Sequence, residues 1–168
     1  MHANLSQKQN VFIYIEDFEH HSIDKKWKDQ KYNFGVGGTT FNQLRLISEL
    51  QDNYKNFLKI TALTDKSSDY IFPNSIKTYS FDILKNNNNE NSILIINSGG
   101  CQRHFKLLKK LKFKKVLICL HHPFDKKKCL LAKDLNAEII SCGLFQYFSN
   151  SIYTGRHSYI NNFFYEKD

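Results

Sequence analysis

The sequence lacks any long hydrophobic run, and this absence excludes one class of protein. Across its 168 residues no apolar segment approaches the roughly 20 residues that a helix needs to cross a bilayer. Residues 1–10 are polar, and the apolar run Val11–Ile15 is too short for the core of a secretory signal. The sequence therefore predicts a soluble, cytoplasmic protein, or one that lies on the cytoplasmic face of a membrane.

Arginine is scarce: the chain has 3 Arg against 21 Lys, although its formal net charge is +8. Arg is the residue that binds bases and phosphates through two parallel hydrogen bonds, and the chain has no RNA-binding aromatic motif. Both absences argue against nucleic acid as a partner. The basic residues gather between Arg103 and Lys128, where Asp125 is the only acid. Such a segment suits an anionic membrane surface or a phosphorylated ligand, and is equally consistent with a solvated face.

Paired cysteine spacings are also missing. We expect reduced thiols at all four cysteines, which are Cys101, Cys119, Cys129 and Cys142. Two of them lie near histidines, in Cys101-x-x-His104 and Cys119-x-His121, but neither arrangement forms the paired ligand pattern of a zinc site. The sequence predicts no metal site and no cofactor.

The most informative segment that is present is 35–50, a glycine-rich turn that leads into a helix. Leu44 and Ile47 belong to an apolar stripe at helical spacing, and polar residues fall on the opposite side. Thr39 or Thr40 is the expected N-cap of this helix.

The glycines of this turn could let backbone N–H groups and the positive end of the helix dipole face an anion. On this interpretation Gly37, Gly38 and Thr39 bind substrate or phosphate. The alternative is a tight turn that only caps the helix.

Strand and helix patterns alternate along the rest of the chain. Short apolar runs predict buried strands, and one run is alternating and more exposed; strands are expected at 11–15, 57–64, 76–81, 92–96, 116–120, 138–141 and 159–162. Helices are expected from 41 onward and at 101–112, 125–136 and 143–151, and the asparagine-rich segment 86–91 is expected to be a surface loop. This alternation predicts one domain, 1–168, with an α/β fold: a doubly wound, mainly parallel Rossmann-like sheet with helices on both faces.

In such sheets, ligands bind beyond the carboxyl ends of the strands. Three features are expected there: the glycine turn 35–40, the Asn-Ser-Gly-Gly segment 97–100, and His121 with His122. Their convergence makes His121 the candidate catalytic residue, and adds Ser98 and His122 to the candidate binding residues. The acid and histidine cluster 16–21 could hold a metal or supply an acid and a base, but we favour a solvated loop.

The order of these elements resembles the N-terminal domain of GT-B glycosyltransferases, most closely of family 4. Members open with a strand, a loop and a Gly-Gly turn into a helix patterned like Thr40 to Leu50. They later carry a His at the end of a buried strand, here Ile118-Cys119-Leu120-His121-His122-Pro123, and a strand that ends in Ser, here Ile139-Ile140-Ser141. The last strand of the family ends in Asn-Gly, and this chain keeps Asn161 but has Asn162 in place of the Gly.

The resemblance implies an acceptor-side domain that works with a nucleotide-sugar donor and a glycan or lipid-linked acceptor. It places Gly37 and Gly38 near the donor diphosphate or the acceptor, and His121 at the reaction centre. The donor-binding C-terminal domain of the family, with its Glu-x7-Glu pair, has no counterpart in this sequence. We therefore expect an incomplete enzyme that needs a separate donor-binding chain, or a product without turnover.

Two other classes of protein compete with this hypothesis. A dinucleotide-binding oxidoreductase would need a third glycine where Thr40 stands, and would place the motif directly after the first strand. A non-catalytic basic module for an anionic surface or a phosphorylated ligand needs neither feature, and it is the main alternative.

Overall fold

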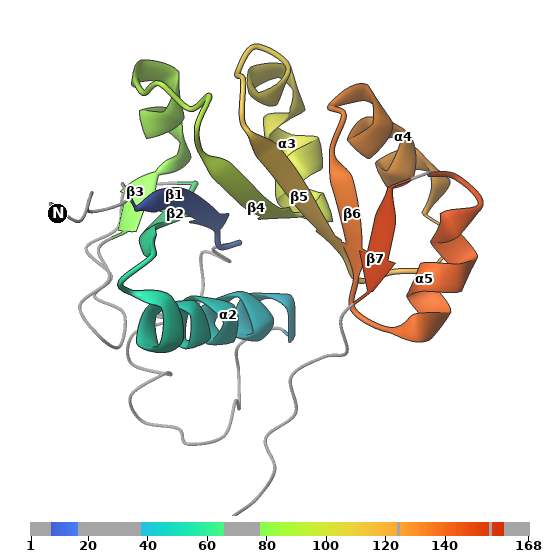
Figure 1. The fold of residues 1–168 in the computed structure, drawn as a ribbon. Coiled ribbons are helices and arrows are strands. Elements are labelled where there is room, and N and C mark those ends of the chain that lie inside the picture. The colour runs from blue at the N-terminus through green and yellow to red at the C-terminus, as the bar shows by residue number, and fades with distance from the viewer. Residues whose placement is uncertain (1–7, 17–37, 66–77, 124, 155, 160–168) are drawn as a thin grey trace, which may run out of the picture.

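The protein forms a seven-stranded sheet with helices on both faces in a computed structural model that describes residues 8–16, 38–65, 78–123, 125–154 and 156–159 (Figure 1). The strands are β1 (Gln9–Tyr14), β2 (Leu58–Thr64), β3 (Thr78–Ser80), β4 (Ile93–Asn97), β5 (Lys115–Leu120), β6 (Glu138–Ser141) and β7 (His157–Tyr159). The helices are α2 (Gly38–Tyr54), the 3-10 helix η1 (Phe81–Asn86), α3 (Ser98–Leu108), α4 (Lys126–Asp134) and α5 (Leu144–Ser151).

All neighbouring strands are parallel, in the order β3-β2-β1-β4-β5-β6-β7. The first strand is thus internal to the sheet, with β2 on one side and β4 on the other. The strand order reverses between β1 and β4, which is the defining feature of a doubly wound sheet. The predicted fold class is confirmed, and the sheet is entirely parallel.

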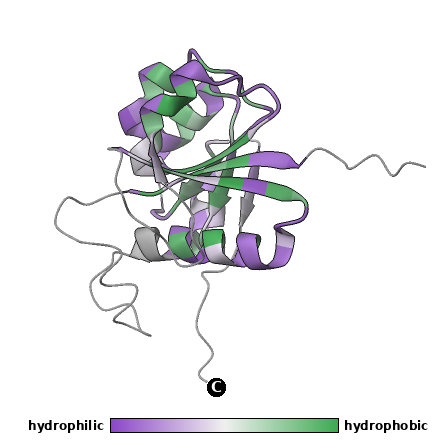
Figure 2. Cartoon of the chain, turned by 90° about the vertical axis from the view of Figure 1, so that its left-hand side faces the viewer, coloured by the Kyte–Doolittle hydropathy of each residue, from purple (hydrophilic) through white to green (hydrophobic). Residues whose placement is uncertain are grey.

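Alternate residues of each strand supply two separate cores. In β1, Ile13 packs toward α2, and Phe12 and Tyr14 pack toward the opposite layer of η1, α3 and α4. The two helix layers lie below and above the sheet in Figure 1, and Figure 2 shows apolar residues concentrated along the strands between them. Burial on both faces explains why the strands appear in the sequence as continuous apolar runs.

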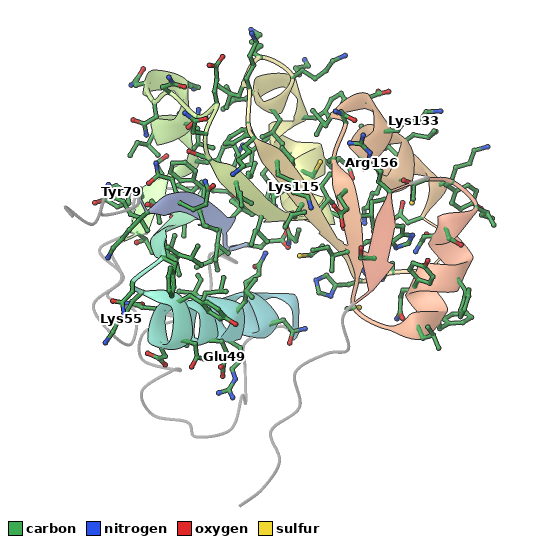
Figure 3. All side chains as sticks on the ribbon, viewed as in Figure 1. Glu49, Lys55, Tyr79, Lys115, Lys133 and Arg156 are labelled. Carbon is green, nitrogen blue, oxygen red and sulfur yellow. The ribbon has the colours of Figure 1, made fainter. Side chains whose placement is uncertain are left out.

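Helix α2 has the predicted amphipathic character. Leu44 and Ile47 are buried against the sheet, and Glu49 points away from it (Figure 3), where it pairs with Arg45 over 3.0 Å. The prediction of a threonine N-cap is wrong, because the helix begins at Gly38 and both threonines lie within its first turn.

Helix α3 begins earlier than its sequence pattern indicates. It starts at Ser98, directly after β4, because the Asn97 side chain accepts a hydrogen bond from the Gly100 N–H over 2.7 Å and so caps the helix. It also ends four residues earlier than expected, at Leu108. The two glycines at 99–100, expected in a loop, are therefore in the first helical turn.

The segment after β3 is a second departure from expectation. The third strand was expected to reach Phe81, but it ends at Ser80, whose side chain caps η1 by accepting from the Asp82 N–H over 3.4 Å. Within the loop 86–91, Asn89 is buried and donates from Nδ2 to the Leu84 carbonyl over 2.9 Å. That asparagine therefore has a structural role in closing the loop.

All four cysteines are free, as expected. Burial raises the pKa of the Cys101 thiol to about 12 and that of Cys129 to about 11, so both remain protonated at neutral pH. Among the described helices, none combines the length and the apolar character that crossing a membrane requires.

Candidate functional site

The strand order reverses between β1 and β4, and a doubly wound fold binds its ligand at the carboxyl end of the sheet beside such a point. Four polar residues end or follow the strands around it: Glu16 after β1, Asp65 after β2, Asn97 in β4 and His121 after β5. They form two groups, one on each side of β4.

The first group is a network of side chains centred on Asp65. The Tyr14 hydroxyl donates to Asp65 Oδ1 over 2.7 Å, and His104 Nε2 lies 2.7 Å from the same oxygen. Arg103 forms an ion pair with Asp65 Oδ2 and donates to the Tyr14 hydroxyl oxygen over 3.0 Å. The His104 ring stacks on Phe81 with a centroid separation of 3.9 Å. The network therefore connects β1, β2, η1 and α3.

Glu16 extends this network toward β4. Its Oε1 atom lies 3.3 Å from Arg103 Nη2, and its Oε2 atom accepts from Asn97 Nδ2 over 2.5 Å. Only 14% of the Glu16 side chain is exposed, so the solvated-loop interpretation is wrong for this residue. The other members of that cluster, 17–21, lie outside the described residues. Within the described ranges, no three His, Cys, Asp or Glu side chains are placed to hold a metal ion.

The protonation states of this network are fixed by its contacts. Burial alone would raise the pKa of Asp65, but hydrogen bonds from Tyr14 and His104 and the charge of Arg103 outweigh it and hold that pKa below its ordinary value. Burial, followed by the hydrogen bond to Asp65, raises the pKa of Tyr14. At neutral pH the carboxylate is therefore ionised and the phenol is protonated, which suits a structural ion cluster better than a general acid or base.

The glycines of α3 allow this helix to approach β1 closely. A Cβ atom on Gly100 would lie 2.3 Å from a Tyr14 ring carbon and 2.8 Å from Asn97 Oδ1. A Cβ atom on Gly99 would lie 3.1 Å from Glu16 Oε1. The glycine pair is therefore explained by packing between α3 and β1, and no bound ligand is needed to account for it.

The second group consists of His121 and His122, on the other side of β4. In the ladder Asn97 pairs with Cys119, so the chain of β5 continues to His121 beyond the point where β4 turns into α3. His121 Nε2 is buried and has no hydrogen-bond partner among the described residues. Burial lowers the pKa of His121, and the charges of His122 and Lys128 lower it further, so its imidazole is neutral at neutral pH.

The remaining predicted site residues occupy different surroundings. Gly37 lies outside the described residues, and Gly38 and Thr39 form the backbone of the first turn of α2. That end of α2 is near the carboxyl end of β1, because Gln43 Oε1 accepts from the Glu16 N–H over 3.4 Å. Ser98 is buried at the start of α3.

His122 is exposed, and its backbone carbonyl accepts from Asn150 Nδ2 over 2.9 Å. The strand order places the predicted residues at one end of the sheet, but no hydrogen bond among the described residues joins His121 to the Asp65 network.

A serine and a histidine lie together at the end of β6. Ser141 Oγ and His157 Nε2 are 2.6 Å apart, and the His157 ring lies against Tyr147 with a centroid separation of 4.8 Å. Ser141 is completely buried, so a substrate has no path to its hydroxyl in this structure. We interpret this pair as a structural link between β6 and β7.

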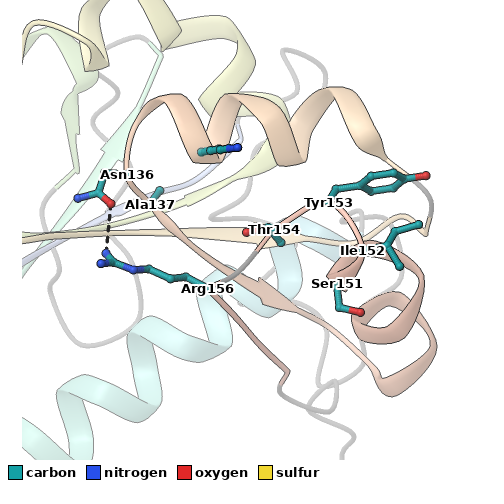
Figure 4. A pocket seen from close by; sticks show the side chains of 8 residues that line it. Asn136, Ala137, Ser151, Ile152, Tyr153, Thr154 and Arg156 are labelled. Atoms are coloured by element: carbon teal, nitrogen blue, oxygen red, sulfur yellow. Dashed lines mark hydrogen bonds between the residues drawn. The ribbon is translucent and has the colours of Figure 1, made fainter.

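Two pockets, of about 410 and 400 Å³, open at the opposite, amino end of the sheet. The first lies between α4, α5 and the start of β7 (Figure 4) and is lined by Lys133, Asn136, Ala137, Ser151, Ile152, Tyr153, Thr154 and Arg156. Arg156 donates to Asn136 Oδ1 over 3.2 Å across this pocket. The pocket is thus far from the carboxyl end of the sheet and is bordered by two cations.

Comparison with known proteins found no family model that matches the chain, and no curated protein or solved structure that matches it significantly. The fold and the geometry of the carboxyl end therefore define the class of protein: a doubly wound α/β domain with a histidine, one strand beyond the reversal point, whose buried Nε2 atom has no hydrogen-bond partner among the described residues.

Sequence reasoning missed the central members of the network, Asp65, Arg103, His104 and Tyr14. Asp65 could have been found, because it follows a predicted strand and so belongs at the same end of the sheet as His121. The scarcity of arginine was a second signal, since Arg103 is one of only 3 in the chain. His104 and Tyr14 carried no signal, because their contacts depend on how α3 packs against β1.

Proposed function

We propose that the chain is the acceptor-side half of a glycosyltransferase that moves a sugar from a nucleotide-sugar to a glycan or lipid-linked acceptor. The observation that carries this proposal is His121. It lies after β5, one strand beyond the reversal point, with a buried Nε2 atom that no described group contacts through a hydrogen bond. A buried polar atom without a partner costs roughly 1–3 kcal/mol, and a hydroxyl group of a bound sugar would remove that cost.

The neutral state of His121 suits this role. A neutral imidazole can accept a hydrogen bond at one ring nitrogen and donate at the other, so Nε2 could orient an acceptor hydroxyl or take its proton as the oxygen attacks. Because Asn97 pairs with Cys119, His121 lies at the same end of the sheet as the first turn of α3. The positive end of that helix favours negative charge nearby, including that of a departing diphosphate.

The Asp65 network serves this site indirectly. Its carboxylates neutralise Arg103 and hold α3 against β1 and β2. We therefore assign it to the placement of α3 and not to the chemical step.

A complete site would require a second component. Transfer needs the donor and acceptor to be held in one geometry with water excluded, and the resemblance to GT-B enzymes assigns the donor to a different domain. The proposed function therefore includes a separate donor-binding chain or domain as partner, and no cofactor.

Binding of acceptors to His121 is testable on the isolated chain. Imidazole resonances of the seven histidines can be followed by NMR while short α- and β-linked glycans, and separately UDP-glucose, are added. We expect a glycan to shift the signals of His121 and of the neighbouring His122 in a saturable manner, and we expect the shift of His122 to disappear in His121→Ala. If no glycan perturbs His121, the acceptor-side assignment is wrong.

A non-catalytic module for anionic ligands is the second candidate, and the pocket bordered by Lys133 and Arg156 favours it. Its test is binding to acidic and neutral liposomes. If this candidate is right, the protein binds acidic liposomes at low salt and is released as the salt concentration rises. Each lysine near the membrane surface contributes about 1 kcal/mol to the binding free energy. At physiological salt this attraction is screened beyond about 8 Å. Equal binding to neutral liposomes would contradict it.

A further inference from the structure

Helix α5 and its C-cap residue, Ile152, carry most of the large hydrophobic side chains that the described part of the chain exposes. Leu144, Phe145, Phe148 and Ile152 expose 48%, 62%, 61% and 71% of their surface. The other three such residues in the described ranges lie elsewhere: Tyr54 in α2, Phe57 in the turn before β2 and Leu130 in α4. Exposed apolar residues are ordinary when scattered, but a group on one element indicates an interaction surface.

Three of these residues form a straight stripe, here called the α5 stripe. Leu144, Phe148 and Ile152 are four residues apart, so they lie one above the other along one side of the helix. The helix lies against β6 and β7, beside the last strand of the sheet (Figure 1). The stripe is thus at the margin of the fold, where a second molecule can reach it.

The absence of charge from α5 and its flanking residues indicates what covers the α5 stripe. Residues 139–155 contain no charged side chain, whereas 24% of the whole chain is charged. The centres of protein interfaces are depleted in charge and enriched in aromatic residues. A helix that lies in a membrane interface instead carries Lys or Arg along its polar side, and α5 carries neither. The composition of α5 therefore favours a protein partner over a lipid surface.

The spacing of the stripe indicates a partner identical to the chain itself. Phe148 is the midpoint between Leu144 and Ile152, so a two-fold axis at Phe148 sets two copies of α5 antiparallel. Leu144 of one copy then meets Ile152 of the other, and Phe148 meets its own counterpart. Isologous dimers require this kind of self-complementary surface, and none of the residues that meet in it is charged.

We propose that the protein forms a homodimer through two-fold packing of the α5 stripe. With roughly 150–250 Å² as the full area of a large side chain, the four residues expose on the order of 500 Å² per copy. A standard interface buries about 800 Å² per partner. The α5 stripe together with Phe145 supplies over half of this area, so the dimer dissociates on dilution, with a Kd on the order of micromolar. This inference is independent of the proposed function.

The strength of dimerisation should depend on salt concentration in a way that distinguishes it from membrane binding. Each copy carries a formal charge of +8, so the two copies repel one another outside the neutral contact. Added salt screens this repulsion and tightens the dimer. Binding to an anionic membrane responds to salt in the opposite direction.

The test is sedimentation equilibrium of the full chain, from low to high micromolar concentration, with two matched variants. Phe148→Ser removes the centre of the stripe, and Phe57→Ser removes an equally exposed phenylalanine, 65% exposed, from the turn before β2. We expect the wild type and Phe57→Ser to dimerise alike, and Phe148→Ser to bind at least about tenfold more weakly. A wild type that is monomeric at every concentration overturns the proposal, as does equal weakening by both variants.

Cross-linking tests the two-fold axis itself. In Phe148→Cys the new thiols of the two copies meet at the axis, within the Cα separation of about 4.4–6.8 Å that a disulfide needs. Mild oxidation should give a covalent dimer on a non-reducing gel that neither the wild type nor Phe57→Cys gives. If the wild type dimerises but Phe148→Cys does not cross-link, the two-fold arrangement is wrong. A monomeric wild type that binds acidic vesicles through Phe148 would assign the stripe to a membrane instead.

Discussion

The three arginines of the chain show how single residues are used in this fold. Arg45 pairs with Glu49 over 3.0 Å, and Arg156 donates to Asn136 over 3.2 Å. Arg103 contacts three acceptors at once, on Glu16, Asp65 and Tyr14. A planar guanidinium with five donors can do this, and a lysine ammonium cannot reproduce the geometry. Each arginine therefore has a defined partner, in a chain whose basic charge is otherwise almost entirely lysine.

The closest approach of α3 to β1 gives a prediction about Gly100. In Gly100→Ala the new methyl group would lie 2.3 Å from the Tyr14 ring, so the helix or the ring must move. We expect the free energy of unfolding, measured by urea denaturation, to fall by about 1–3 kcal/mol, as for other overpacked sites.

Gly99→Ala is the matched control for this substitution. Its methyl group would meet the end of the Glu16 side chain at 3.1 Å, which can shift, and alanine is intrinsically better than glycine in a helix by about 0.5–1 kcal/mol. We expect little change in stability. Equal losses for both variants would show that the first turn of α3, and not its contact with Tyr14, sets the requirement for glycine.

Two partly buried histidines predict how stability depends on pH. Burial lowers the folded-state pKa of both His121 and His157 below the ordinary 6.5, so the unfolded chain binds protons more readily than the folded one. The stability is fully present above pH 6.5 and is lost as the pH falls through the lower folded-state values. The lowered pKa of Asp65 affects the stability only as the pH falls below about 3.8, the ordinary pKa of this carboxyl group.

Urea denaturation at several pH values, from about 1 unit above to about 1.5 units below the ordinary histidine pKa of 6.5, measures this effect. We expect His121→Gln to reduce the loss of stability on acidification, and we expect His122→Gln to reduce it less, because His122 acts only through the effect of its charge on His121. A wild-type stability that is constant over this range would contradict the prediction.

At the scale of elements, the junction between β4 and α3 depends on one amide group. Asn97 accepts from the Gly100 N–H and donates to Glu16 Oε2 over 2.5 Å. The variant Asn97→Asp keeps the oxygen that caps α3, but its new carboxylate faces the carboxylate of Glu16. We expect a loss of about 1–3 kcal/mol at pH 7 that shrinks near pH 4, where one proton can bridge the pair.

The comparison with Asn97→Ala separates the two roles of this side chain. That variant loses the cap, at a cost of about 1 kcal/mol, without adding a charge, so its loss should not shrink on acidification. The measurement is urea denaturation of both variants and of the wild type at each pH. If the losses of the two variants have the same pH dependence, repulsion from Glu16 is not the cause.

The elements that the sequence predicted well are those whose signal is local. The strands β2, β5 and β6 agree with the prediction to within a residue, because burial on both faces leaves an apolar run. The start of α3 was missed, since the pair Gly99 and Gly100 is typical of a loop and is helical here only through contacts with Tyr14 and Asn97. Contacts between segments far apart in sequence decide such cases.

The same division applies to the candidate site. The position of His121 followed from a strand pattern, because the carboxyl ends of parallel strands share one end of the sheet. The environment of its Nε2 atom could not be predicted, since it depends on the packing of side chains from several elements. The Asp65 network likewise joins residues up to 89 positions apart in sequence.

At the scale of the whole molecule, the proposed function predicts that the isolated chain does not turn over nucleotide-sugars. A single domain forms only one side of such a site, so it cannot both hold the donor and exclude water from it. The measurement is release of nucleoside diphosphate from UDP-glucose or GDP-mannose, with glycan acceptors present. Turnover that is abolished in His121→Ala would show that the chain is a complete enzyme and that the requirement for a second component is wrong.

The internal position of β1 has a consequence for synthesis on the ribosome. The sheet first extends from β1 through β2 to β3, then from the other side of β1 through β4 to β7. Each strand after β1 therefore emerges when a strand that it pairs with has already been made, and only the second edge of β1 has to wait, for β4. Domains fold N-terminal parts first during translation. This chain can thus assemble its sheet strand by strand as it is made, with a single newly exposed edge at each step.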